Sequence, residues 1–184
     1  VDDAEEEALL GDVIDAANAA DVNTQSEVQA LADAVQSVMD AAAGTSGKPS
    51  EAELNALGIT GVTGDNLAAI QQVIAATIDD GTGVDDLTEL QTLVTGAANA
   101  AATALTSISA AAQADSATSS SPAQSVYEDA GVTGVSGSNL ADINNLLNTA
   151  NITGALTDTT AEVQALVDGY NAIQTAADGT ANNN

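Results

Sequence analysis

Apolar residues recur along this chain at intervals of three and four positions, which is the spacing of one face of an α-helix. No stretch sustains the alternation of apolar and polar residues that marks a half-buried strand. The pattern therefore predicts an all-α protein. It is clearest in two sets, Leu67, Ile70, Ile74 and Ile78 in the first half and Leu140, Ile143 and Leu147 in the second.

Much of this pattern occurs twice, 73 positions apart. Residues 57–70 read LGITGVTGDNLAAI and residues 130–143 read AGVTGVSGSNLADI. The register holds without a gap from Pro49 and Pro122 to Gly96 and Gly169. Self-similarity at a fixed period indicates an internal duplication.

Each full copy divides into three expected helices. The first is short and opens near a proline, which the first helical turn tolerates because the missing amide would lack a partner there. A Gly-x-Thr-Gly corner, 58–61 or 131–134, then ends it, since glycine accepts a positive φ at a helix C-terminus. The second helix follows the corner, with Asp65 or Ser138 as its expected N-terminal cap.

The third helix is expected to begin near residues 85–86 in one copy and 158–159 in the other. Glu89 and Glu162 are placed to complete capping boxes there. In the first full copy this helix continues through an Ala-rich stretch, eleven residues longer than the corresponding stretch before it. A helix of that length would join two bundles, and a Ser-rich linker at 115–125 follows it.

A third, partial copy stands at the beginning of the sequence. TQSEVQAL at 24–31 matches TTAEVQAL at 159–166, and Leu10, Val13 and Ile14 correspond to apolar positions of the later second helices. The sequence therefore predicts tandem small three-helix modules. Their expected bounds are a partial helical hairpin at 1–46, a three-helix module with an extended last helix at 47–116, and a linker plus a three-helix module at 117–184.

Charge narrows the set of partners. There are 27 acidic residues against one base, Lys48, and the formal net charge is −26. Nucleic acids and anionic membrane surfaces attract clusters of Lys and Arg, so neither is an expected partner. Like charges repel unless ions screen them, which favours a saline extracellular setting, with a salt-rich cytoplasm as the alternative. Residues 90–114 approach the length of a membrane span, but polar residues and Ala dominate them, so no membrane insertion is expected.

Few side chains here can carry catalysis. The chain has no Cys, His or Arg, which excludes thiol nucleophiles, catalytic triads and phosphoryl-transfer clamps. Paired carboxylates hydrolyse glycosides, but such sites also need a cleft and aromatic platforms that this composition does not favour. We therefore expect no enzyme activity and no cofactor.

Calcium is the metal for which the sequence offers ligands, because oxygen-rich loops suit a hard cation. The aligned stretch of the next copy, ITGALTDT, keeps only Asp158, and no EF-hand pattern is present. The favoured interpretation is that these acids cap a helix N-terminus, where the macrodipole stabilises negative charge. The candidate ligands, around two glycines in DDGTGVDD, are Asp79, Asp80, Asp85 and Asp86.

Aromatic residues are almost absent. Tyr127 and Tyr170 are the only two, so thin cores of Ala, Leu, Ile and Val are expected. We expect both tyrosines in a core or at its rim. The alternative is that they lie at the surface and anchor a protein partner.

The segments GVTGDNLAAI and TAEVQALVDGYNAI resemble the helical repeats of very large secreted bacterial surface proteins, especially adhesin-like proteins of aquatic bacteria. The module is similar, more loosely, to the three-helix albumin-binding-type modules of Gram-positive surface proteins. The closer resemblance covers residues 50–105 and 123–178. It implies export to the bacterial cell surface and a spacer or adhesive role, whereas no matching albumin-contact residues are present.

Three functions remain. The leading one is a non-enzymatic structural spacer of a secreted surface protein, presenting or extending an adhesive region. One alternative is a subunit of a self-assembling extracellular filament or surface layer, because the partial first copy leaves apolar surface for an identical subunit or neighbouring module. Another is an adhesive module that binds a host or matrix protein. The opening VDDAEEEALL is unlike an export signal, so a mature or excised piece is expected.

Overall fold

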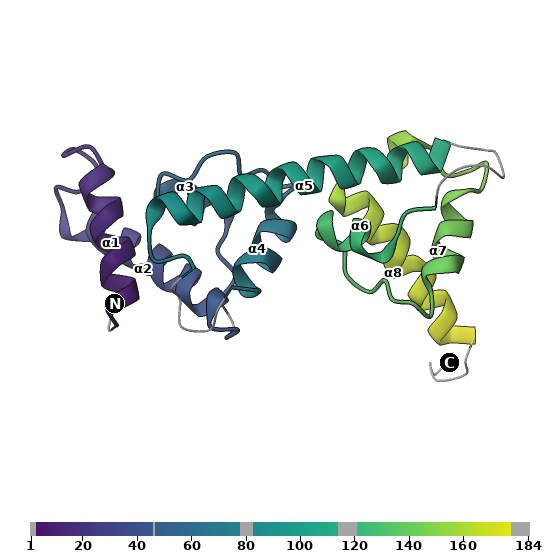
Figure 1. Ribbon diagram of the computed structural model, residues 1–184, viewed down its shortest axis with the longest axis horizontal. Helices are drawn as coiled ribbons and strands as arrows, with labels where there is room; N and C mark the ends of the chain where they lie inside the picture. Colours follow the sequence, from purple (N-terminus) through teal and green to yellow (C-terminus); the bar gives the residue numbers. More distant parts are fainter. Residues whose placement is uncertain (1–2, 46, 78–82, 114–120, 178–184) are drawn as a thin grey trace. The chain divides into compact units, whose positions relative to one another are not determined.

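Helices account for the regular structure of the chain. The computed structural model describes residues 3–45, 47–77, 83–113 and 121–177 (Figure 1). Within these residues there are eight α-helices, one short 3-10 helix and no strand, which confirms the all-α prediction. The helices are α1 Ala4–Ala16, α2 Gln25–Ala42, α3 Glu51–Ala56, α4 Leu67–Ala75, α5 Leu87–Gln113, α6 Gln124–Asp129, α7 Leu140–Leu147 and α8 Thr160–Ala177, and the 3-10 helix η1 is Gly154–Leu156.

Two compact units make up the chain, Val1–Asn99 and Ala100–Asn184. The core of the first unit draws on α1 to α4 and on Leu90 and Val94 in the first half of α5. The core of the second unit draws on α6, α7 and α8 and on Ile108 in the second half of α5. None of the described helices combines the length and the apolar content that a membrane crossing requires.

The modules expected from the repeat, 1–46, 47–116 and 117–184, stay a prediction beside this division into two units. Val35 and Val38 of α2 are buried in one core with Leu54 and Ile70, so α2 packs with the helices that follow it. The unit boundary falls inside α5. The predicted linker lies outside the described residues as far as residue 120.

The second half of α5 repeats the packing of α2 despite the eleven extra residues. Val35 and Met39 of α2 are buried, as are Ile108 and Ala112, 73 positions later. Eleven residues make about three helical turns at ~3.6 residues per turn. The insertion therefore lengthens α5 while leaving its apolar stripe on nearly the same face.

Helix starts are set by local hydrogen bonds. At α5 the Asp86 carboxylate accepts from the amides of Thr88 at 2.7 Å and Glu89 at 3.2 Å. Elsewhere reciprocal capping boxes satisfy two amides at once. They join Thr24 with Glu27 at α2, Ser50 with Glu53 at α3, and Thr159 with Glu162 at α8.

The predicted caps of α4 and α7, Asp65 and Ser138, do not occupy that position. The N-cap residues are Asn66 and Asn139, and neither side chain caps the helix that it precedes. A turn already begins at Thr63, whose carbonyl accepts from the amides of Asn66 and Leu67. The Asn66 side chain therefore reaches back, accepting from the Thr63 amide at 2.8 Å and donating to the Gly61 carbonyl at 2.8 Å.

Candidate functional site

The glycine corners are built by backbone hydrogen bonds. Gly58 and Gly61 have φ of +84° and +83°, a conformation that L side chains rarely adopt. The Gly58 amide donates to Asn55 and the Ile59 amide to Leu54, both at 3.0 Å. This is the Schellman arrangement that ends a helix. Gly131 and Gly134, at +76° and +82°, repeat it, which confirms the predicted role of these glycines.

A glutamine of the third helix holds each corner. The Thr60 amide donates to Gln91 Oε1 at 2.9 Å, and Gln91 Nε2 donates back to the Thr60 carbonyl at 3.2 Å. Thr133 and Gln164 form the same pair at 2.8 and 3.1 Å. We call each Gln–Thr pair a corner clamp. It joins residues 31 positions apart, so it fixes the third helix on the corner.

The corner clamp was missed in the sequence analysis. The repeat could have indicated this clamp, because Gln91 and Gln164 occupy equivalent positions on otherwise polar helix faces. The second unit has two further hydrogen bonds at its corner, both made by Asn171. Asn171 of α8 donates to the Gly134 carbonyl at 3.1 Å and accepts from Asn139 at 2.9 Å, whereas position 98 in the first unit is alanine.

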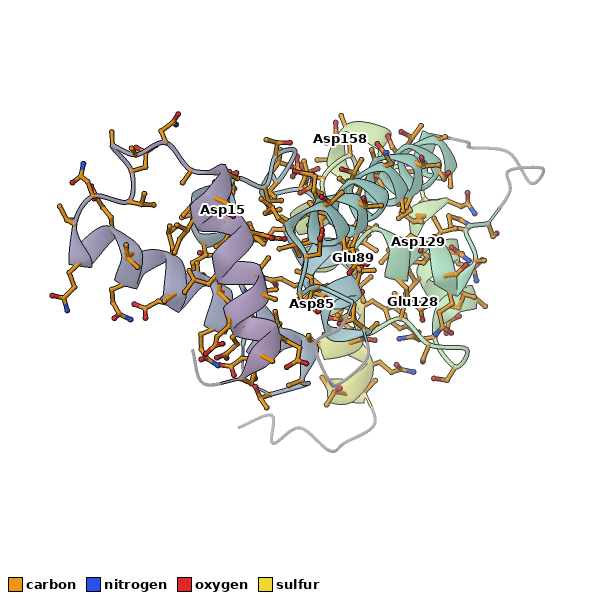
Figure 2. All side chains as sticks on the ribbon, turned by 60° about the vertical axis from the view of Figure 1, so that its left-hand side comes forward. Asp15, Asp85, Glu89, Glu128, Asp129 and Asp158 are labelled. Atoms are coloured by element: carbon orange, nitrogen blue, oxygen red, sulfur yellow. The ribbon has the colours of Figure 1, made fainter. Side chains whose placement is uncertain are left out.

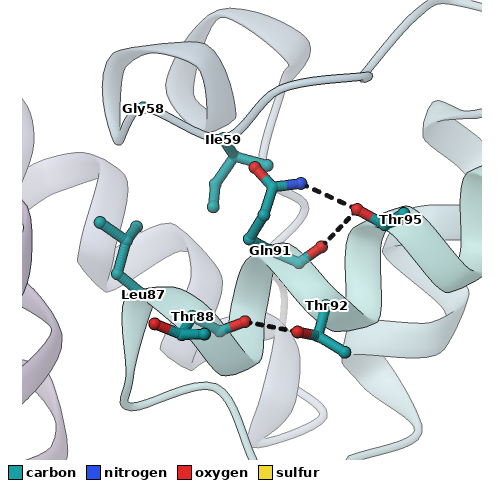
Figure 3. A pocket seen from close by; sticks show the side chains of 7 residues that line it. All are labelled: Gly58, Ile59, Leu87, Thr88, Gln91, Thr92 and Thr95. Carbon is teal, nitrogen blue, oxygen red and sulfur yellow. Dashed lines mark hydrogen bonds between the residues drawn. The ribbon is translucent and has the colours of Figure 1, made fainter.

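A shallow hollow of about 470 Å³ lies beside the first corner (Figure 3). Three of its four polar side chains already have partners within α5. Thr92 donates to the Thr88 carbonyl and Thr95 to the Gln91 carbonyl, both at 2.8 Å, while Gln91 Nε2 donates to Thr95 at 3.0 Å. No ionisable side chain lines it. The lining residues are Gly58, Ile59, Leu87, Thr88, Gln91, Thr92 and Thr95.

A second hollow, of about 630 Å³, lies between α1, the start of α2 and the end of α3. Its acidic residues are Asp21 and Glu27. Asp21 accepts from Asn18 at 3.1 Å, and Glu27 belongs to the capping box of α2. Neither hollow therefore presents a nucleophile together with a general base.

The calcium candidates fall in two groups. Asp79 and Asp80 lie outside the described residues. Asp85, labelled in Figure 2, is half-buried before α5. Asp86 caps that helix. Across the described residues, acidic side chains do not gather in threes as a cation would require. Figure 2 shows them spread over α1, the start of α5, α6 and the loop before α8.

The two tyrosines have different surroundings. Tyr127 is fully buried, and its hydroxyl donates to Asn144 Oδ1 at 2.8 Å while Asn144 Nδ2 donates to the Pro122 carbonyl at 3.0 Å. Burial raises the pKa of the Tyr127 hydroxyl well above its usual range. Tyr170 is half-buried and donates to Asp142 at 2.8 Å. Of the two predicted partner anchors, only Tyr170 reaches the surface.

One carboxyl has a shifted pKa because of its capping role. The Thr159 hydroxyl donates to Glu162 at 2.9 Å and the Thr159 amide donates to it at 3.3 Å, and the bond from the hydroxyl is the main cause that lowers the pKa of the Glu162 carboxyl. The ionised form is the one that caps α8, two residues before Gln164. The lowered pKa therefore keeps Glu162 ionised as the cap of α8.

Family models, curated proteins and solved structures gave no match to this chain. The polar groups at both corners are bonded within their own unit, and in the described part of the chain no buried side-chain polar atom lacks a hydrogen-bond partner. These contacts hold backbone in place.

Proposed function

We propose that this chain is a non-enzymatic structural spacer built from tandem helical modules. Each module consists of a short helix, a glycine corner, a second helix and the first half of a long helix, preceded by the second half of another long helix. The long helix α5 serves both units. Such a module extends an array without adding chemistry.

The observation that carries this proposal is the recurrence of the corner clamp. Gln91 with Thr60 and Gln164 with Thr133 agree in partner atoms and to within 0.1 Å in both bonds. A ligand site needs polar groups left for the ligand, whereas these are paired inside the module in both copies. Repetition of a backbone support is the expected signature of a building block.

Charge and composition support a place outside the cell, and the resemblance to secreted repeats implies a bacterial surface protein. The net charge of −26 repels neighbouring copies in dilute solution, and salt as concentrated as seawater shortens the screening length to a few ångströms. In a spacer this repulsion also opposes collapse of the array on itself. Adhesion would then belong to other parts of the surface protein.

The test adds a module. A chain in which residues 87–159 occur twice in succession keeps all helices in register, because Leu87 and Thr160 are equivalent positions of the repeat. We expect the same helical content per residue by circular dichroism and a higher total free energy of urea unfolding, because the new module brings its own core and interface.

A matched control repeats residues 92–159, five residues fewer. Removing five residues at the junction rotates the apolar face of the helix that follows by roughly 140° relative to the in-register chain, at ~3.6 residues per turn. The control should lose helical content per residue and unfold at lower urea. Equal behaviour of the two insertions would refute the modular account.

A further inference from the structure

Three apolar residues on the first two helices are less covered than their equivalents elsewhere. Leu10 and Ile14 of α1 and Val28 of α2 are half-buried. Leu9 and Val13 anchor α1 to its own unit from a neighbouring face, at 0% and 3% exposure. The equivalent residues in the two full copies are at most 1% exposed. In the first full copy they are Ile70 and Ile74, 60 positions later, and Leu90, 62 positions later; in the second, another 73 positions on, they are Ile143, Leu147 and Val163.

The equivalent residues show what covers such a face. Ile70 and Ile74 of α4 and Leu90 of α5 share one core with the second half of α2, where Val35 and Val38 are buried. In the second unit the second half of α5 takes that place, with Ile108 in the core. The covering element is thus the second half of a preceding long helix.

The second half of α8 carries the surface that such an element uses. Thr24 and Thr159 are equivalent caps, so Val35 and Val38 of α2 correspond to Tyr170 and Ile173. Both valines are 0% exposed, whereas Tyr170 is half-buried and Ile173 is 72% exposed. Tyr170 packs against the edge of its own core, whereas Ile173 lacks the packing that Val38 has in α2.

We propose that the second half of α8 in one copy packs against α1 and the first half of α2 in a second copy. The proposal rests on the modular account above. The α8 face supplies Tyr170 and Ile173, the equivalents of Val35 and Val38. The opposing face supplies Leu10, Ile14 and Val28, the equivalents of Ile70, Ile74 and Leu90. Two different faces meet, so the contact is heterologous and propagates head to tail instead of closing as a symmetric dimer.

Charge sets the conditions for this association. The faces that would meet carry acidic residues and no base. These are Glu5, Glu7, Asp12 and Asp15 on α1, Glu27 and Asp33 on the first half of α2, and Asp168 on the second half of α8. The two faces repel at low ionic strength, and screening removes most of that repulsion. Association therefore strengthens with added NaCl, the opposite of an interface held by ion pairs.

Sedimentation velocity of the full chain tests the proposal, in dilute buffer and in molar NaCl, over a wide range of protein concentration. The average mass should rise with concentration, and more steeply in NaCl. Ile173→Gln should stay monomeric. Leu156→Gln is the matched control, because Leu156 is 51% exposed on the same unit but outside the proposed contact, and it should behave as the parent chain.

Mixing two variants establishes the polarity of the contact. Val28→Gln blocks the α2 face and Ile173→Gln blocks the α8 face, so each alone should be monomeric while their equimolar mixture forms a one-to-one dimer. Circular dichroism checks that each variant keeps its helices, and Leu10→Gln replaces Val28→Gln if that variant does not.

Three outcomes would overturn the proposal. They are a parent chain that stays monomeric in molar NaCl, association that survives Ile173→Gln, and a mixture that stays monomeric. None of them affects the insertion test of the module, so failure of the docking contact and failure of the spacer function can be told apart.

Discussion

Gly58 shows how one residue decides where a helix ends. Its φ of +84° lets two amides reach back to the last carbonyls of α3. A side chain in this left-handed conformation costs about 1–2 kcal/mol. We therefore expect Gly58→Ala to lower the free energy of unfolding of the first unit by that amount in urea titrations.

Gly64 is the matched control for this substitution. It follows the same corner, its φ is not positive, and an added Cβ would meet nothing within 4 Å. Gly64→Ala should change the free energy of unfolding by less than about 0.5 kcal/mol. Equal losses from both substitutions would mean that the positive φ is not what the corner depends on.

Tyr127 should make the second unit sensitive to alkali. Its folded pKa lies above the unfolded value, so the unfolded chain loses this proton first. The stability linked to the proton is complete below pH ~10, the usual tyrosine pKa, and is lost as pH rises beyond it. Tyr127→Phe should abolish this alkaline loss, although loss of the bond to Asn144 costs about 1–2 kcal/mol at neutral pH.

Tyrosinate absorbance measures the effect directly, because Tyr127 and Tyr170 are the only aromatic residues. In the parent chain the Tyr127 hydroxyl should ionise only together with loss of helix, and this step should be absent from Tyr127→Phe. Complete tyrosine ionisation in the folded parent chain would contradict burial of Tyr127.

The sequence predicted the glycine corners because their chemistry is local. A positive φ has few solutions other than glycine, so Gly58 and Gly131 could be placed from the pattern alone. The caps of α4 and α7 could not, because Asp65 and Asn66 are both good capping residues. The choice between them depends on the turn that already starts at Thr63, which needs the folded corner.

In the first unit the side chain of one glutamine attaches the third helix to the corner. Gln91 forms two bonds to the backbone of Thr60 in an exposed setting, where water competes for them. Gln91→Ala should therefore lower the free energy of unfolding of the first unit by about 1 kcal/mol. Amide exchange at Thr60 should also accelerate, while Thr133 keeps its protection.

Gln29 provides the control from the partial copy. It is the equivalent of Gln91 at a shift of 62 residues, yet it faces no corner and donates only to Asp33 at 2.8 Å on its own helix. Gln29→Ala should change stability by less than about 0.5 kcal/mol. A loss as large as that of Gln91→Ala would show that helix propensity or surface polarity, and not the corner clamp, is responsible.

The face of α1 illustrates what periodicity leaves open. The repeat aligned Leu10 and Ile14 with the buried Ile70 and Ile74, but α1 buries Leu9 instead. Apolar residues at 9, 10, 13 and 14 form a stripe wide enough to pack from either side. Which side is buried depends on the helices packed against it, and the periodicity of one helix does not show them.

The long helix α5 contributes to two cores. The spacing of its apolar residues made this predictable, whereas the ends of the helix did not. Eleven extra residues return the apolar stripe to nearly the same face, so Ile108 is buried as Val35 is. The division into units could not be read from the repeat. A helix that serves two bundles places the unit boundary inside itself, whereas the repeat only suggested where copies begin.

Small side chains and a high acidic load shape the chain overall. Alanine and a few branched residues fill each core, so each unit depends on short-range supports such as the capping boxes and the corner clamps. An array built this way gains stability by adding modules, and no single core has to be large.

Small-angle scattering of chains carrying none, one, two and three in-register copies of residues 87–159 tests the spacer function most directly, under salt conditions in which each is monomeric. The account predicts a radius of gyration that rises by a nearly constant increment with each added copy. A radius of gyration that grows only as about the 0.38 power of chain length, as for compact domains, would contradict it.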